Sequence, residues 1–306
     1  MRDITLRSLR IFEAAASASS FSRAAEVLEM TQSAVSQQIR VLEDEVKTKL
    51  FDTQARPVQL TDAGRELLRH ARSILAQVNI ATDSLASLEG QFRGQLHIGA
   101  VSPSNYFVPH LMAAFRQRFP DVRMKLTMSK RDTLLAMLAE HRLDVIIGGF
   151  PPSETDVEVE AFARHPHCLV AAANHPLASR RGLEWRELSN EPFILREPNS
   201  ATRRFFEHLL QVQGLQVSIN LELEGNETVK QAVMVGLGIS FLSAHVFQLE
   251  LAAGKLAVLD VLDTPKWLDW CILTRREVEI PAVRKAFRDF VITEGAAFTR
   301  CETKSP

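Results

Sequence analysis

The chain has 306 residues, of which 46 % are hydrophobic and 24 % charged, a composition typical of a globular protein with two or three domains. No apolar run reaches the ~20 residues that span a bilayer, and the amino terminus lacks the apolar core of a signal peptide. Membrane insertion and secretion are therefore not expected. The three cysteines, Cys168, Cys271 and Cys301, lie far apart and form no disulfide framework, which favours a reducing cytoplasm.

Three helices are predicted within the first 50 residues. Residues 5–17 have the apolar period of an amphipathic helix, and Ser20 or Ser22 can cap a second one. Thr31 is the predicted N-cap of the third helix. On that third helix an apolar stripe at helical spacing predicts a buried face, formed by Val35, Ile39 and Leu42.

The opposite face of the third helix carries short or planar hydrogen-bonding groups, namely Ser33, Ser36, Gln37 and Arg40. No acidic side chain lies between Thr31 and Leu42, although Glu43 follows at once. A helix with amides, hydroxyls and a guanidinium, and without carboxylates, suits the major groove of DNA. The pattern predicts a DNA-reading helix; a solvated helix face is the alternative.

The charge of this region argues mildly against a DNA binder. The net charge of the chain is −1, and residues 1–60 carry eight Lys or Arg and eight Asp or Glu. Because non-specific affinity for DNA comes from neutralised phosphates, one copy should bind DNA only modestly. A dimer with two reading helices would relieve this difficulty.

A hairpin wing and a long helix follow. The polar turn 52–57 and the extended run 58–60 predict the wing, with Arg56 placed to meet a phosphate or the minor groove. Thr61 then caps a helix that runs to about Leu88. Its apolar positions alternate spacings of four and three, as in a coiled coil: Leu67, Ala71, Ile74, Val78, Ala81, Leu85 and Leu88. This stripe predicts a dimer seam, the alternative being a helix that lies on its own domain.

From Gln95 onward, strand-like runs alternate with helical segments, which predicts an α/β fold. The predicted strands are 96–100, 122–128, 145–148, 168–172 and 239–242, and the predicted helices are 109–119, 133–140, 201–213 and 227–235. The segment 90–94 is the predicted hinge after the long helix. The tail after Thr299 is predicted to be frayed. The expected domains are 1–60, 61–90 and 91–306.

Loops between a strand and a helix are candidate ligand sites, because helix N-termini at the carboxyl ends of strands bind anions. Hydroxyls, amides and cations gather at these places: Ser102, Ser104, Asn105, Thr127, Ser129, Lys130 and Arg131. Gly149 follows the third strand, and Arg203 and Asn226 lie at later helix starts. Such groups favour a carboxylate or phosphate ligand. Ordinary helix capping is the alternative.

Other chemistry finds little support. The segment 236–240 completes neither a nucleophile elbow nor a dinucleotide-binding fingerprint, so no catalytic residue and no cofactor are predicted. His165 and His167 lie near Cys168 but lack a fourth ligand close in sequence, so no metal site is predicted. The spacing of the cysteines does not favour a redox pair, and Cys168 and His97 are expected to be structural.

Taken together, the motifs of this chain resemble those of LysR-type transcriptional regulators over nearly its whole length. The motifs that carry this resemblance are Leu9-Arg10-Ile11-Phe12, Ser22 to Leu28, Thr31 to Ile39, Leu42-Glu43, Leu50-Phe51 and Leu60 to Gly64. Thr53 stands where the family usually has Arg, so one contact of the wing with the DNA backbone is not expected here. The segments 106–109, 115–120 and 226–243 resemble regulators of carbon-fixation (Calvin-cycle) operons.

The resemblance implies a winged helix-turn-helix, a linker helix and a two-lobed effector domain of the periplasmic-binding-protein type. Lobe I would span about 91–162 and 266–300, and lobe II about 163–265. It also implies a homodimer or tetramer on promoter DNA, at a partly palindromic site with a T, eleven unspecified bases and an A, together with contact to RNA polymerase. Base edges would be met by Gln32, Ser33, Ser36 and Gln37, and the DNA backbone by Thr31, Arg40 and Arg56.

The expected protein is a transcriptional regulator, not an enzyme, whose effector is a small phosphorylated or organic-acid metabolite bound between the lobes. A metabolic enzyme or solute-binding protein with an unrelated helical extension is the alternative. That alternative would need a nucleophile, a cofactor fingerprint or an export signal, and the sequence shows none. An architectural DNA binder would leave the α/β part without a use.

Overall fold

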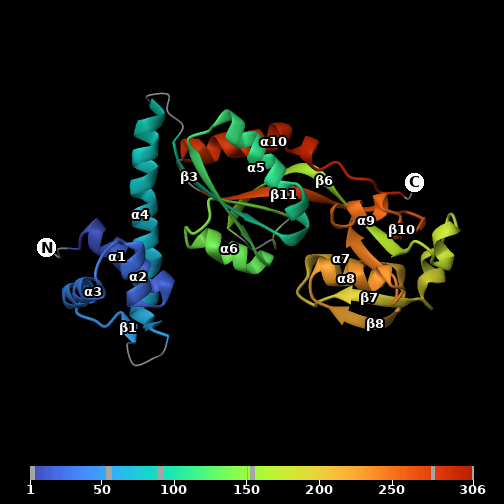
Figure 1. Ribbon diagram of the computed structural model, residues 1–306, viewed down its shortest axis with the longest axis horizontal. Helices are drawn as coiled ribbons and strands as arrows, with labels where there is room; N and C mark the ends of the chain where they lie inside the picture. The colour runs from blue at the N-terminus through green and yellow to red at the C-terminus, as the bar shows by residue number, and fades with distance from the viewer. Residues whose placement is uncertain are drawn as a thin grey trace. The chain divides into compact units, whose positions relative to one another are not determined.

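A computed structural model describes residues 4–52, 57–88, 93–149, 151, 156–276 and 280–304 (Figure 1). Its contacts divide the chain into two compact units. The first holds residues up to 93, with 136–143 and 279–282, and the second holds the rest. Each unit is described by itself below.

Three capped helices form the first unit: α1 (Leu6–Ala18), α2 (Phe21–Val27) and α3 (Gln32–Val46). Each begins where a hydroxyl accepts a backbone N–H three residues on, at Thr5, Ser20 and Thr31. The predicted caps Ser20 and Thr31 are thus confirmed. The apolar stripe of α3 is buried against α1 and α2 around Phe12, as predicted.

The predicted wing is confirmed as a hairpin of β1 (Phe51–Asp52) and β2 (Gln59–Leu60), paired antiparallel. Thr61 caps the helix that follows, α4 (Asp62–Leu88), by accepting the N–H of Gly64 at 3.0 Å. A Cβ on Gly64 would lie 2.1 Å from the carbonyl oxygen of Leu50. Glycine is therefore required where the start of α4 crosses the start of the wing.

The predicted apolar stripe of α4 is buried in one part and exposed in another. Its amino-terminal part packs on the core of its own unit through Leu67 and Ala71. Farther along, Ile74 is 45 % exposed and Leu85 is 66 % exposed. Packing within the unit thus covers the amino-terminal part of the stripe and leaves Ile74 and Leu85 exposed, whereas Ile80, outside the stripe, is buried.

In the second unit, lobe I is one half of a seven-stranded sheet (Figure 1). Its strands are the parallel β3 (Gly94–Ala100), β4 (Val122–Met128) and β5 (Val145–Gly148), then β11 (Lys266–Arg275), antiparallel to β5, and the first part of β6 (Val157–Ala172), antiparallel to β11. Its helices are η1 (Ser102–Tyr106), α5 (Val108–Arg118), the first part of α6 (Arg131–Ala139) and, from Val283, α10 (Ala282–Phe298). Phe107, Phe115 and Phe287 centre the core.

Lobe II continues the sheet from the second part of β6, which pairs with β9 (Ser240–Ser243) and β10 (Leu256–Val258). A parallel pair, β7 (Pro192–Arg196) and β8 (Ser218–Leu223), lies beside it. The helices are η2 (Pro176–Ser179), η3 (Trp185–Leu188), α7 (Ala201–Gln213), α8 (Asn226–Met234), η4 (Ala244–Val246) and α9 (Gln248–Ala252).

The end of β6 reads as a continuous apolar run because both of its faces are covered. Cys168 and Val170 pack on the side of α8, whereas Leu169 and Ala171 pack on the side of α7. Together with β11, β6 runs between the two lobes.

Several sequence predictions need correction. The predicted strand 168–172 is only the end of β6, whose earlier part carries charged residues such as Glu160 and Arg164 and so lacks an apolar run. Strands also occur where none is predicted, at β7, β8, β10 and β11. The predicted hinge 90–94 lies largely outside the described residues, which resume at Arg93.

The tail after Thr299 was predicted to be frayed, and through Lys304 this is wrong. The backbone N–H of Glu302 donates to Oε1 of Gln248 at 2.7 Å, and Nε2 of Gln248 donates to the carbonyl of Glu302 at 2.9 Å. Cys301 packs against the core of lobe II. A side chain distant in sequence thus satisfies the backbone of the tail, and no local pattern reveals this.

Candidate functional site

The polar face of α3 is available to a partner. Thr31, Gln32, Ser33, Gln37 and Arg40 are exposed, whereas Ser36 is half-buried. The opposite stripe is fully buried, so the helix presents its polar face outward from the unit. This arrangement places six of the seven predicted DNA-binding residues on one surface. The seventh, Arg56, lies outside the described residues, as does Thr53.

Hydrogen bonds along α3 order the side chains of this face. Nε2 of Gln32 donates to Oγ of Ser36 at 3.1 Å, and the hydroxyls of Thr31 and Ser33 lie 3.1 Å apart. These bonds restrict rotamers before any partner binds, which lowers the entropy lost on binding. The acidic residue that follows, Glu43, is buried and turned inward, so it does not charge this surface.

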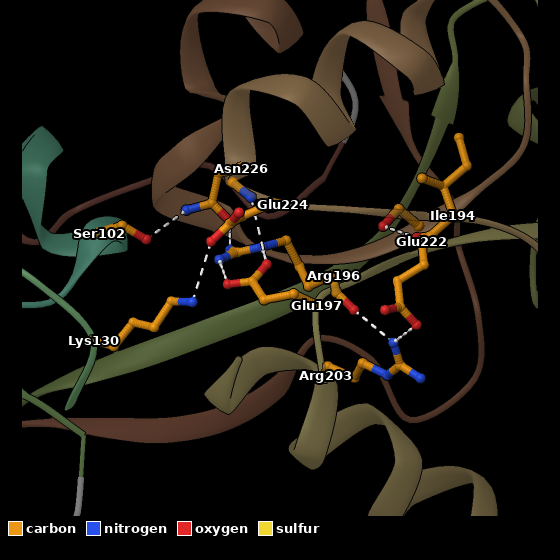
Figure 2. A network of polar contacts seen from close by, with 11 residues as sticks. Ser102, Lys130, Ile194, Arg196, Glu197, Arg203, Glu222, Glu224 and Asn226 are labelled. Atoms are coloured by element: carbon orange, nitrogen blue, oxygen red, sulfur yellow. Dashed lines mark hydrogen bonds and ion pairs between the residues drawn. The ribbon is translucent and has the colours of Figure 1, made fainter. Parts of the chain in front are cut away.

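A second polar cluster joins the two lobes (Figure 2). Nδ2 of Asn226, at the start of α8 in lobe II, donates to Oγ of Ser102, at the start of η1 in lobe I, at 3.1 Å. Oδ1 of Asn226 accepts from the guanidinium of Arg196. Arg196 is itself buried and paired with Glu197 at 2.8 Å. The structure thus brings together Ser102 and Asn226, which were predicted separately.

Two neighbouring cations add positive charge near this cluster. Nζ of Lys130 lies 3.1 Å from a carboxylate oxygen of Glu224 in lobe II (Figure 2). Arg131, the first residue of α6, has a lowered pKa because of burial and the charge of Arg204 on α7. An anion between the two guanidiniums would offset the repulsion that lowers the pKa of Arg131.

Other predicted effector-binding residues already serve the fold. Oγ of Ser104 donates to the carbonyl of Val101 at 2.7 Å, and the hydroxyl of Thr127 lies 2.9 Å from Nε2 of His97. Asn105 is exposed on η1, Ser129 donates its N–H to the carbonyl of Ala100 at 3.2 Å, and Gly149 follows β5.

The guanidinium of Arg203 is bound by groups of lobe II, although Arg203 is predicted to contact the effector. Its guanidinium donates to Oε1 of Glu207 at 2.7 Å and to the carbonyl of Arg196 at 2.9 Å, and it also binds Glu222 (Figure 2). Arg196, which lies nearer to Asn226, was missed. Arg196 is the last residue of β7, and the sequence pattern predicts no strand there. The pattern therefore gave no reason to expect Arg196 where the lobes meet.

A third contact between the lobes was also missed. The hydroxyl of Tyr106, at the end of η1, donates to the carboxylate of Glu227 on α8. Nζ of Lys230 lies 5.5 Å from the centre of the Tyr106 ring. Tyr106 is the only tyrosine of the chain, but this fact alone gave no reason to pair it with α8.

Buried histidines occupy the strands between the lobes. Nε2 of His165 bonds Oγ of Ser243 at 2.8 Å, and the His165 ring stacks on Trp270 at 3.9 Å. Nε2 of His245 bonds the carbonyl of Thr299 at 3.0 Å. The imidazoles are thus engaged in packing and hydrogen bonds. Among the described residues, no group of three or more His, Cys, Asp or Glu could hold a metal ion.

The pKa values of the three thiols are raised. Burial raises the pKa of Cys168 and of Cys271 to about 12, and that of Cys301 to about 11. Thiols of this kind are poor nucleophiles at neutral pH.

Within the described ranges, no helix is long and apolar enough to cross a membrane.

The three-helix unit with its wing and the two-lobed α/β unit are those of a helix-turn-helix regulator with a ligand-binding-type domain. Residues 6–65 match the bacterial regulatory helix-turn-helix family of the lysR type, and residues 89–296 match the LysR substrate binding domain. The chain therefore belongs to the LysR family of transcriptional regulators and is not an enzyme.

Characterised relatives agree over the full length. The chain is 40 % identical over 293 residues to the RuBisCO operon transcriptional regulator of Allochromatium vinosum, covering 96 % of this chain and 97 % of that protein. It is 41 % identical over 286 residues to CbbR of Rhodospirillum rubrum, covering 94 % and 95 %. The resemblance to carbon-fixation regulators is thereby confirmed.

Solved structures support the same fold. The regulatory domain of Synechocystis CcmR, in complex with 2-PG, matches with a TM-score of 0.63 and 28 % identity, covering 68 % of this chain and 99 % of that domain. Full-length CbnR complexed with its target DNA matches with a TM-score of 0.67 and 22 % identity, covering 94 % and 99 %. The second likeness concerns the fold alone.

Proposed function

We propose that this LysR-type regulator reads a promoter of a carbon-fixation operon through the exposed polar face of α3. The observation that carries the proposal is the combination of a buried apolar stripe with an outward face free of carboxylates. Gln32, Ser33, Ser36 and Gln37 would contact base edges, and Thr31, Arg40 and Arg56 the DNA backbone. The relatives named as RuBisCO operon regulators support the choice of operon.

The proposed effector is a small anionic metabolite bound where the lobes meet, near Ser102, Lys130, Arg131 and Asn226. The two guanidiniums Arg131 and Arg204, one from each lobe, favour an anion there. The 2-PG complex of the CcmR regulatory domain supports a ligand of this kind and makes 2-PG the first compound to test. Ser104, Asn105, Thr127, Ser129 and Gly149 would shape the surroundings, and Arg203 would act only by orienting lobe II.

The functional division of the chain is proposed to be 1–60 for DNA binding, 61–90 for dimerisation and 91–306 for effector sensing. The exposed Ile74 and Leu85 of α4 would meet a second copy in a homodimer or tetramer. Contact with RNA polymerase at the promoter completes the proposal. A regulator that reads chromosomal promoters acts in the cytoplasm, where the chromosome lies.

The experiment that tests DNA reading selects genome fragments that the purified protein binds at near-physiological salt. The Ser33→Ala/Gln37→Ala variant is compared with wild type and with Gln211→Ala, a matched control on α7. We expect a few promoter fragments to be enriched by wild type and by the control, and lost in the double variant. Equal enrichment by all three proteins would remove the assignment of α3 as the reading helix.

A further inference from the structure

Tyr106 connects the two lobes through its ring and its hydroxyl. The hydroxyl donates to the carboxylate of Glu227 and lies 3.5 Å from Nζ of Lys230, whose charge also faces the ring. Lobe I supplies Tyr106 from η1, and lobe II supplies Glu227 and Lys230 from α8. We name these three residues the interlobe latch.

The lobe II side of this latch is held in place by its own ion pairs. Lys230 is only 3 % exposed, and its ammonium lies 2.8 Å from Glu250 and 3.0 Å from Glu227. A buried ammonium is retained only when carboxylates neutralise it, so Lys230 cannot readily leave this position. Burial raises the pKa of Tyr106 to about 12, with help from Glu227, so the phenol stays protonated and remains a donor.

The latch adjoins the proposed effector contact at both of its ends. η1 carries Ser102 at its start and Tyr106 at its end, and α8 carries Asn226 directly before Glu227. Within η1, Pro103 and Ser104 are buried, so the five residues are anchored as one short segment. A ligand that enters between Ser102 and Asn226 must lengthen their 3.1 Å hydrogen bond, and this displaces Tyr106 relative to Glu227.

We propose that the interlobe latch of Tyr106, Glu227 and Lys230 opposes effector entry and transmits it to the relation between the lobes. The inference rests on the proposed effector site and adds its regulation. A ligand gains affinity only to the extent that its own contacts exceed those that it disrupts. Weakening the latch therefore tightens effector binding and moves the unliganded protein toward the liganded DNA footprint.

The first test needs no ligand and no DNA. Amide hydrogen exchange of the full chain is compared for wild type, Glu227→Gln and Glu207→Gln, a matched carboxylate substitution on α7 of the same lobe. Glu227→Gln retains the Lys230–Glu250 pair, so lobe II is expected to stay folded, which thermal melting checks. We expect Glu227→Gln to speed exchange at least fivefold in 101–107 of lobe I, and Glu207→Gln to leave it unchanged. Unchanged exchange in Glu227→Gln would overturn the latch.

The second test measures 2-PG affinity by calorimetry and the promoter footprint with and without 2-PG. We expect Tyr106→Phe, which retains the ring, to bind 2-PG three- to tenfold more tightly and to show a ligand-free footprint shifted toward that of liganded wild type. Equal or weaker binding, or an unshifted footprint, would overturn the proposal.

The experiments distinguish failure of the proposed function from failure of the latch. If wild type binds the promoter but not 2-PG, that choice of effector is wrong, and the exchange experiment decides the latch. If wild type binds no promoter, the DNA-reading assignment is wrong, and the exchange experiment decides the latch alone.

Discussion

The carboxylate of Glu43 on α3 accepts the backbone N–H of Leu50 at 2.9 Å, across the turn that leads into the wing. The same oxygen accepts from Phe51 at 3.4 Å, and the other oxygen pairs with Lys49 at 2.6 Å. Glu43 is almost fully buried. One side chain of the reading helix therefore satisfies the backbone at the start of β1 and sets the position of the wing relative to α3.

Glu43→Ala is expected to destabilise the first unit by about 2–3 kcal/mol, because it leaves two buried N–H groups without an acceptor. Asp44→Ala, at the next and exposed position, is the control and should change stability by less than about 0.5 kcal/mol. Urea unfolding followed by circular dichroism measures both. A Glu43→Ala loss as small as that of the control would contradict the structural role of this carboxylate.

The histidines between the lobes predict a loss of stability in mild acid. Burial lowers the pKa of His167 to about 3 and of His245 to about 4, and it lowers the pKa of His165 well below its usual value. In the unfolded chain these groups titrate near 6.5. As the pH falls from about 6.5 toward 4, the unfolded state takes up protons that the folded state does not, so stability falls.

Each such histidine contributes up to about 1.4 kcal/mol per pH unit to this slope. His245→Gln, which retains a donor toward the carbonyl of Thr299, is expected to reduce the slope between pH 5 and 6 by about that amount. Urea midpoints at four pH values give the slope, with the exposed His208→Gln as control. The same slope in His245→Gln and wild type would refute the assignment of a buried neutral imidazole.

The raised pKa values of the three cysteines predict insensitivity to oxidants. With pKa values of about 11 to 12, less than about one thiol in a thousand is a thiolate at pH 7.5. Ellman's reagent is therefore expected to label the native protein at least a hundredfold more slowly than the urea-unfolded chain. Peroxide should leave promoter binding unchanged. Fast labelling, or loss of binding under peroxide, would show that a thiol is activated.

The exposed part of α4 predicts the oligomeric state. Ile74→Lys with Leu85→Lys places two charges where we expect a partner helix, and each would have to be buried without a counter-charge. The double variant is expected to weaken dimerisation at least a hundredfold in sedimentation velocity. Val212→Lys, at an equally exposed position on α7, should have no effect. An unchanged dimer in the double variant would place the interface elsewhere.

Much of the first unit follows from local sequence pattern. The caps Ser20, Thr31 and Thr61 lie where a hydroxyl precedes an apolar period, and the hydrogen bond each one makes is only three residues long. The polar face of α3 could likewise be predicted, because burial of Val35 and Ile39 dictates which side chains point outward. Helical periodicity therefore determined both α3 and the direction in which its polar face points.

The meeting of the lobes could not be predicted in this way. Ser102 and Asn226 are 124 residues apart, and Tyr106 and Glu227 are 121 apart, so no local period relates them. Their proximity depends on how β6 and β11 carry the chain between the lobes, and on a bulge in their register at Trp270. Sequence also favoured Arg203 over Arg196, since a helix start is visible in a pattern whereas the partners of a guanidinium are not.

The sequence by itself determined the order of the parts, the polar face of α3 and the family, because these depend on short-range periodicity and on contiguous motifs. Only the tertiary structure decided which polar groups face one another across the lobes and which cations are already neutralised. Those contacts depend on strand register and on packing between distant segments, where a shift of one residue reverses the direction of a side chain.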